Sequence, residues 1–185
     1  MATTKWILDP THSDLGFKIK HLMISNVSGS FKNFEVVVET EDENDFSTAK
    51  VNLKADMSSI TTNNEQRDAH LQGSDFFSVD KHPEMEFNST EVEMVDDENF
   101  KLHGELTLRG ITHPVTLNVE YSKVTRDPWG GERAGFVVTG KINRSKWGVN
   151  FNSVMETGGL GLGEEVKIHS DLQVVKQPAE ELVVG

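Results

Sequence analysis

The sequence predicts an all-β protein whose antiparallel strands, about eight in number, close into a single barrel. Two observations support this prediction. Apolar and polar residues alternate with a period of two along most of the 185 residues, as in strands that turn one face to the core and one to water. The segments between these runs are rich in Gly, Pro, Asn and Asp, which form turns. Closure into a barrel buries the apolar face and removes exposed strand edges.

The alternation recurs in segments of strand length. In residues 14–21, Leu15, Phe17 and Ile19 share one face, and His21 continues it. The pattern returns in residues 31–38, 51–55, 85–95, 102–108, 115–121, 136–142 and 166–174. Strands of about ten residues suit the tilted wall of a barrel better than a compact sandwich.

Two segments interrupt the period. Residues 61–73 begin with Thr and Asn, which cap helices, and they stop at Gly73, a residue typical of the position after a helix. We therefore expect one short helix of two to three turns, lying over one end or side of the sheet. Residues 143–150 are expected to form a turn or a short helix before the last strand.

The strand pattern runs as one unit, so we expect a single domain over residues 1–176 and a flexible tail over 177–185. The net charge of −12 disfavours nucleic acid and anionic membrane surfaces, and the absence of cysteine excludes disulfides and thiolate sites. No run approaches the ~20 apolar residues of a transmembrane helix. The first residues lack the apolar core of a signal peptide, which favours the cytoplasm, although a cloned mature form of a periplasmic protein would look the same.

The predicted inward face mixes large and small residues, so the barrel can be hollow or filled. Small residues such as Gly104 and Gly140 stand among Phe and Leu residues and would leave volume for one ligand. Alternatively, these glycines sit at bulges or tight bends. The sequence leaves both possibilities open.

A few polar residues lie close to the dry face. His21 is either a core or rim histidine or a ligand contact. The spacing of Arg67, His70 and Leu71 puts them on one helix face, where the two polar side chains would grip an anionic or polar head group. An Arg67–Asp68 pair that only fixes the helix explains this segment equally well. Because the histidines lack metal-ligand spacing and no G-x-S-x-G motif occurs, we expect no metal site, catalytic residue or cofactor.

Several motifs, taken together, resemble those of one family. They are WILDPTHS at 6–13, KHL at 20–22, GSF at 29–31, SITT at 59–62, RDAHL at 67–71, SDFF at 74–77, HPEMEFNS at 82–89, GELTLRGITHPVTL at 104–117, DPWG at 127–130, INR at 142–144 and Trp147. From Trp6 to about Lys176, the chain resembles the YceI-like, polyisoprenoid-binding proteins.

This resemblance implies a lipocalin-like, extended barrel with a lid-like helix, and it suggests a homodimer. It implies an apolar tunnel that holds a polyisoprenoid or similar amphiphile, such as an isoprenoid quinone, a polyprenyl phosphate or a fatty-acyl lipid, which purified protein would retain. The implied role is carriage, storage or sequestration. The alternatives are an enzyme acting on a lipid or prenyl substrate at the barrel mouth, and a filled barrel that serves as an interaction module.

The site residues that we expect fall into two groups. The head-group candidates are Arg67 and His70. The tunnel candidates are Leu15, Phe17, Ile19, His21, Phe31, Ile60, Leu71, Phe76, Phe77, Phe87, Leu106, Leu108, Leu117, Val119, Phe136, Val138, Ile142 and Trp147.

Overall fold

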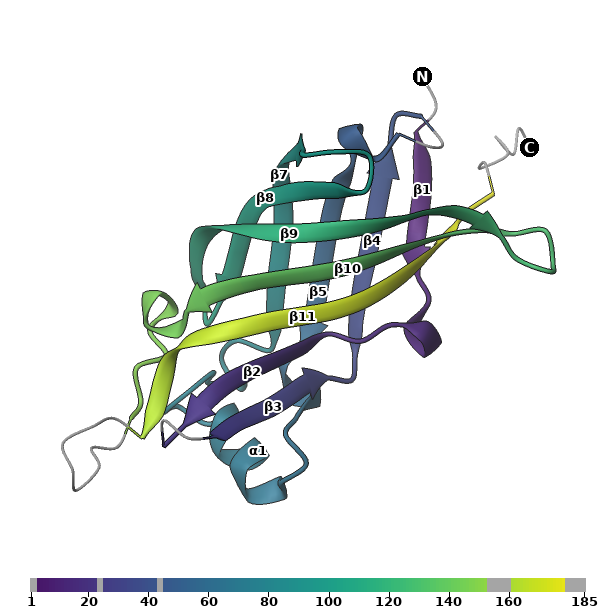
Figure 1. The fold of residues 1–185 in the computed structure, drawn as a ribbon. Helices are drawn as coiled ribbons and strands as arrows, with labels where there is room; N and C mark the ends of the chain where they lie inside the picture. The colour runs from purple at the N-terminus through teal and green to yellow at the C-terminus, as the bar shows by residue number, and fades with distance from the viewer. Residues whose placement is uncertain (1–2, 23–24, 43–44, 153–160, 179–185) are drawn as a thin grey trace, which may run out of the picture.

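The computed structural model of the protein describes residues 3–22, 25–42, 45–152 and 161–178. These residues form a β-barrel with one α-helix at one end (Figure 1). The strands are β1 (Thr4–Leu8), β2 (Gly16–His21), β3 (Ser25–Phe31), β4 (Phe34–Thr40), β5 (Lys50–Asp56), β6 (Ile60–Thr61), β7 (Glu84–Met94), β8 (Asn99–Leu108), β9 (Ile111–Arg126), β10 (Glu132–Asn143) and β11 (Leu162–Lys176). The helices are α1 (Glu65–Gln72) and the short 3₁₀ helices η1 (Pro10–His12), η2 (Phe46–Thr48), η3 (Met57–Ser59) and η4 (Arg144–Trp147).

The predicted eight-stranded antiparallel barrel is confirmed. The order β1-β4-β5-β7-β8-β9-β10-β11 closes on itself because β11 also pairs with β1, with Val174 opposite Leu8. One strand of the closed ring differs from the prediction. The ring contains β1, whereas the alternation predicts residues 14–21 in that place. All eight pairs of adjacent strands in the ring are antiparallel. Successive side chains of each strand point alternately to the interior and to the surface.

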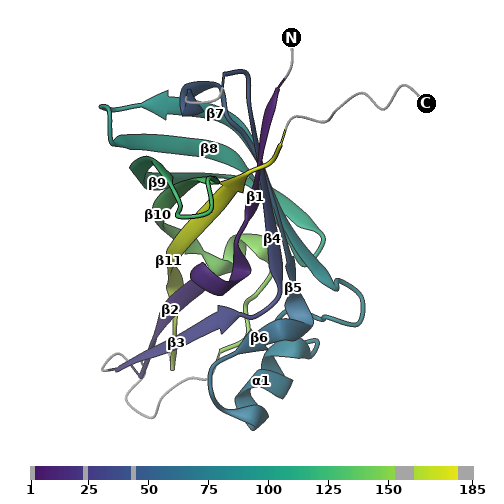
Figure 2. The same cartoon turned by 90° about the vertical axis from the view of Figure 1, so that its right-hand side faces the viewer.

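Strand β11 is long enough to serve two neighbours. Its C-terminal end pairs with β1, and its N-terminal half pairs with β2, with Ile168 opposite Phe17. Strands β2 and β3 continue the sheet beyond the ring of eight, and β3 ends the series on the two-residue β6. The barrel wall is therefore extended at one end, and α1 lies beside β3 and β6 there, away from the two chain termini (Figures 1 and 2).

The predicted short helix is confirmed as α1. The side chain of Asn64 caps its N-terminus by accepting a hydrogen bond from the Arg67 amide, and Gly73 follows its last turn. None of its residues is buried, so contacts with β6 and with the segment after it hold the helix in place. The expected irregular segment at 143–150 contains η4, which ends at Gly148 with a φ of 76°. In the described part of the chain, no helix has the length and apolar character needed to cross a membrane.

An aromatic cluster fills the barrel at the end opposite α1. Phe46, in the connection between β4 and β5, packs its ring against those of Trp6, Tyr121 and Phe136 at centroid distances of 5.2, 5.0 and 5.2 Å. Phe100 joins the cluster through Phe136 at 6.3 Å. We call these five residues the aromatic cluster. It closes one end of the barrel with large side chains.

Neighbouring side chains occupy the space beside the two inward glycines, so these glycines do not open space for a ligand. Gly104 lies opposite a register shift between Ser89 and Glu91, and a Cβ added there would meet the Phe87 ring at 2.4 Å. A Cβ on Gly140 would meet the Leu117 side chain at 2.6 Å. The bulge explanation therefore holds for Gly104, and a neighbouring leucine covers Gly140.

The expected tail lies largely outside the described residues, which end at 178. At its start, Gln177 still donates its backbone N–H to the carbonyl of Lys5 at 2.8 Å. This hydrogen bond prolongs the pairing between β11 and β1 by one residue.

Candidate ligand-binding cavity

The half of the barrel nearer α1 is hollow. A cavity of about 350 Å³ lies between strands β2 to β5, strands β7 to β11 and the α1 segment. The lining is mainly aliphatic and aromatic, and its side chains come from the inward positions that the alternation predicts. A partly open, apolar space of this volume lies within the ~300–1,000 Å³ range of small-molecule sites.

Most of the expected tunnel residues line this cavity. They are Leu15, Phe17, Ile19, His21, Phe31, Leu71, Phe76, Phe77, Phe87, Leu106, Leu108, Leu117, Val138 and Ile142. The head-group candidates Arg67 and His70 line it as well. The structure thus brings residues from both ends of the chain to one space, and their contact with a ligand stays a prediction.

Four expected tunnel residues do not line the cavity. Val119 and Phe136 face a separate void of about 40 Å³ on the side of the aromatic cluster. Ile60 is buried beside Phe31 in the β3–β6 pair. Trp147, 1% exposed, is held outside the cavity because its indole N–H donates to the Leu106 carbonyl at 2.9 Å. Alternation predicts an inward face, but not how far along the barrel axis the space extends.

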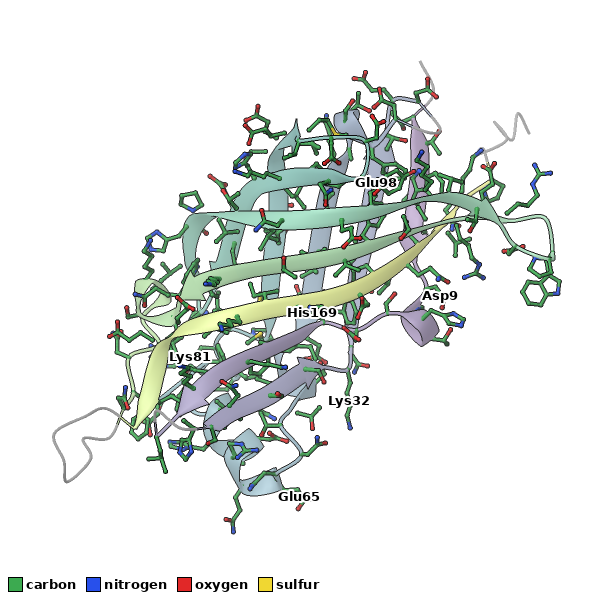
Figure 3. The ribbon with its side chains drawn as sticks, in the orientation of Figure 1. Asp9, Lys32, Glu65, Lys81, Glu98 and His169 are labelled. Carbon is green, nitrogen blue, oxygen red and sulfur yellow. The ribbon has the colours of Figure 1, made fainter. Side chains whose placement is uncertain are left out.

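Sequence reasoning missed part of the apolar lining. Inward positions in the observed strands that also line the cavity include Val51, Leu53, Leu102, Val115, Val166, Ile168 and Leu172. The same period-two signal was available for these residues, so a fuller use of it would have found them. Their neighbours of opposite parity lie outside, as His169 does on β11 (Figure 3).

Arg67 and Asp68 fix α1 through a shared partner, Thr62. The Arg67 guanidinium donates from Nε to Thr62 Oγ1 at 2.7 Å and from Nη2 to the Thr62 carbonyl at 2.8 Å. Asp68 Oδ1 accepts from the Thr62 amide at 2.8 Å and from its hydroxyl at 2.5 Å. Thr62 is buried, so these bonds are sheltered from water. Arg67 therefore holds the helix through Thr62 and also lines the cavity, where its contact with a head group stays a prediction.

His70 lies at the edge of the same end of the cavity. Its Nε2 is 2.9 Å from Asp75 Oδ2, and its side chain is 47% exposed. The imidazole makes edge contacts with the Phe76 and Phe151 rings, both at 5.0 Å. Phe151 thus connects α1 to the segment after η4.

Arg144 is a lining residue that sequence reasoning did not select. Only 5% of it is exposed, and it donates from Nε to Gly163 at 2.9 Å and from Nη1 to Val149 and Phe151 at 2.8 and 2.9 Å, all backbone carbonyls. Burial lowers the pKa of its guanidinium, and nearby Glu164 opposes that shift. The signal in the sequence was an arginine in a segment that breaks the strand pattern, followed closely by a tryptophan.

Comparison with known proteins decides the family. The model of the YceI-like domain matches residues 6–174. The chain belongs to the YceI-like family. A UPF0312 protein of Staphylococcus aureus (strain bovine RF122 / ET3-1) is 45% identical over 171 residues, which cover 92% of this chain and 96% of the relative.

Solved structures share the YceI-like barrel. The crystal structure of the Campylobacter jejuni YCEI protein has a TM-score of 0.74 and 32% identity, and the match covers 92% of this chain and 96% of that one. A polyisoprenoid binding domain from Saccharophagus degradans has a TM-score of 0.65 at 14% identity, covering 94% and 98% of the two chains. At that identity the likeness shows the fold alone.

Proposed function

We propose that this YceI-like protein binds a long-chain polyisoprenoid or a similar amphiphile inside its barrel and acts as a carrier, store or sequestering protein. The observation that carries the proposal is the cavity of about 350 Å³ with its mainly apolar lining. Burial of each CH₂ group of a ligand contributes about 0.8 kcal/mol. The polyisoprenoid class is supported by the family and by the printed description of the S. degradans domain.

The size of the cavity limits the ligand. A volume of about 350 Å³ is near the lower end of the range for drug-sized ligands. A polyprenyl chain of many units would therefore need repacking of the aromatic cluster, or part of it would stay outside the barrel. We expect shorter prenyl chains and fatty-acyl chains to need no such change.

Some finer points of the proposal stay predictions. Arg67 and His70, which lie at the α1 end, are proposed to contact the polar end of the ligand. The homodimer and the cytoplasmic location stay predictions from the resemblance and from the N-terminal sequence respectively. A role as carrier, and not as enzyme, is part of the proposal.

Two adjacent residues of β10 provide a matched test. Val138 faces the cavity, whereas Val137 lies on the opposite face of the same strand. Displacement of a fluorescent fatty acid by polyprenols should show that Val138→Phe weakens binding at least about tenfold, because the added ring occupies ligand space. Val137→Phe should bind as the wild type does. Equal binding by all three proteins would remove the cavity as the binding site.

A further inference from the structure

The charge on the cavity lining is all of one sign. Its charged residues are Arg67 and Arg144, and the lining residues that the structure describes include no Asp or Glu. This is unexpected in a chain with 30 acidic residues, 18 basic residues and a net charge of −12. An acidic protein thus presents positive charge to the inside of its cavity.

Both arginines lie at the α1 end. Arg67 is on α1 itself, and the ring of Phe151 contacts His70 of the same helix at 5.0 Å. The carbonyl of Phe151 in turn accepts a hydrogen bond from Nη1 of Arg144. Phe151 therefore contacts both Arg144 and α1, and these lie at the end of the barrel opposite the aromatic cluster.

Arg144 is a buried cation whose hydrogen bonds all end on neutral groups, while the nearby carboxylate of Glu164 favours its charged form. Its three hydrogen bonds engage Nε and Nη1 and end on backbone carbonyls, and Nη2 makes no hydrogen bond to any residue in the described ranges. Within those same ranges it forms no ion pair with a carboxylate. A buried charge without an opposite charge at ion-pair distance is unfavourable, and a guanidinium offers parallel N–H donors that match an oxyanion.

We propose that Arg144 is the specificity-determining contact for an oxyanion, a carboxylate or a phosphate, on the amphiphile, and that this head group lies inside the barrel at the α1 end. The inference rests on the proposed function and deepens it. Arg67, which is exposed and already bound to Thr62, adds charge at the rim. The tail then points toward the aromatic cluster, where the lining is apolar.

The test compares ligands that differ only in the head group. Dissociation constants are measured for hexadecanoic acid against 1-hexadecanol, and for geranylgeranyl phosphate against geranylgeraniol. Wild-type protein should bind the anion of at least one pair about 10–100-fold more tightly than its alcohol, since a hydrogen bond to a charged group has that effect. The pair with the larger ratio tells whether the head group is a carboxylate or a phosphate.

Three variants locate the effect. Arg144→Met should bring the ratio close to one while the alcohol still binds. Arg67→Met should reduce the ratio less, because Arg67 is exposed. Lys141→Met removes a positive charge from the outer face of the same strand end, at a side chain that is 66% exposed, and should leave the ratio unchanged. Thermal melts establish that each variant is folded, and Arg144→Lys, which keeps the charge, should retain part of the preference.

Several results would overturn the inference. Equal binding of anion and alcohol by the wild type does so without any variant, and so does an unchanged ratio in folded Arg144→Met. A larger loss in Arg67→Met than in Arg144→Met would move the contact to the rim. If neither the anions nor the alcohols bind, the proposed function itself fails, and that outcome is distinct from binding without preference.

Discussion

Arg133 Nη1 lies 2.6 Å from Oδ2 of Asp9, and this ion pair ties the segment after β1 to the β9–β10 hairpin. The Nε of the same guanidinium is 3.1 Å from Asp127 Oδ2. The carboxylates of Asp9 and Asp127 are only 13% and 11% exposed. Asp9 and Asp127, which lie 118 positions apart in the sequence, thereby share one guanidinium.

The Asp9 pair predicts a pH dependence of stability. Hydrogen bonds from His12, Thr11 and Arg133, in that order of effect, hold the pKa of the Asp9 carboxyl well below its usual range. A depressed folded-state pKa stabilises the fold at pH values above the unfolded pKa of about 3.9, and this contribution is lost as the pH falls from there toward the folded value. Asp9→Asn should therefore lower the free energy of unfolding by about 1–3 kcal/mol at pH 7. The difference from wild type should shrink below about pH 4.

Chemical denaturation at a series of pH values measures this effect. Glu120→Gln, at an exposed position of β9, is the control and should match the wild type throughout. If Asp9→Asn were as stable as the wild type at pH 7, the ion pair would contribute nothing to the fold.

We expect the hydrogen bonds of Thr62 to hold α1 in place. Thr62→Val removes the buried hydroxyl that accepts from Arg67 and donates to Asp68, and it leaves both side chains with fewer partners. The expected cost is about 1–3 kcal/mol, with faster hydrogen exchange in the amides of α1. Thr139→Val, at an exposed position of β10, is the matched control. Unchanged exchange in α1 would mean that other contacts hold the helix.

We expect Phe46 to limit the length of the ligand tail that the barrel accepts. The main cavity and the small void share Val36, Val51, Leu102, Val138 and Leu172, and Phe46 packs at the far side of that void. Phe46→Ala should enlarge the void at a cost of about 3–5 kcal/mol in stability. Affinity should then shift toward longer chains, measured as the ratio for geranylgeraniol over farnesol. An unaltered ratio in the folded variant would show that the tail does not reach the aromatic cluster.

A substitution at His21 distinguishes a carrier from an enzyme. It lines the cavity on the exposed end of β2, where it can donate a hydrogen bond to a ligand. His21→Gln keeps a donor and much of the volume, so a carrier should retain its affinity within about threefold. Incubation with prenyl alcohols and phosphates, followed by mass analysis of the products, gives the second readout. Turnover that the wild type shows and His21→Gln lacks, with binding intact, would make the protein an enzyme.

The fold could be predicted because its signal is local and repeated. Alternation such as that of Leu15, Phe17 and Ile19 follows directly from the geometry of a strand, and the Asn64 and Gly73 ends of α1 follow from capping. Alternation could not show that β1, and not residues 14–21, completes the closed ring of strands, because both segments pair with β11. That choice depends on which half of β11 closes the barrel.

The site could be predicted only in part, because depth along the barrel axis leaves no local signal. Phe136 and Val138 have the same parity on β10, yet only Val138 faces the main cavity. Arg144 follows the last regular residue of β10, where the period ends and no face can be assigned. Its inward position results from three carbonyls supplied by segments that meet only in the folded barrel.

Native mass spectrometry of gently purified protein measures whether the hollow half of the barrel holds a lipid. We expect a population heavier than the bare chain by the mass of one amphiphile, which organic extraction releases for identification. Val138→Phe should lose this population, and Val137→Phe should keep it. Wild-type protein that carries no added mass, and that takes up neither a polyprenol nor a fatty acid when these are supplied, would show that the cavity does not bind lipid.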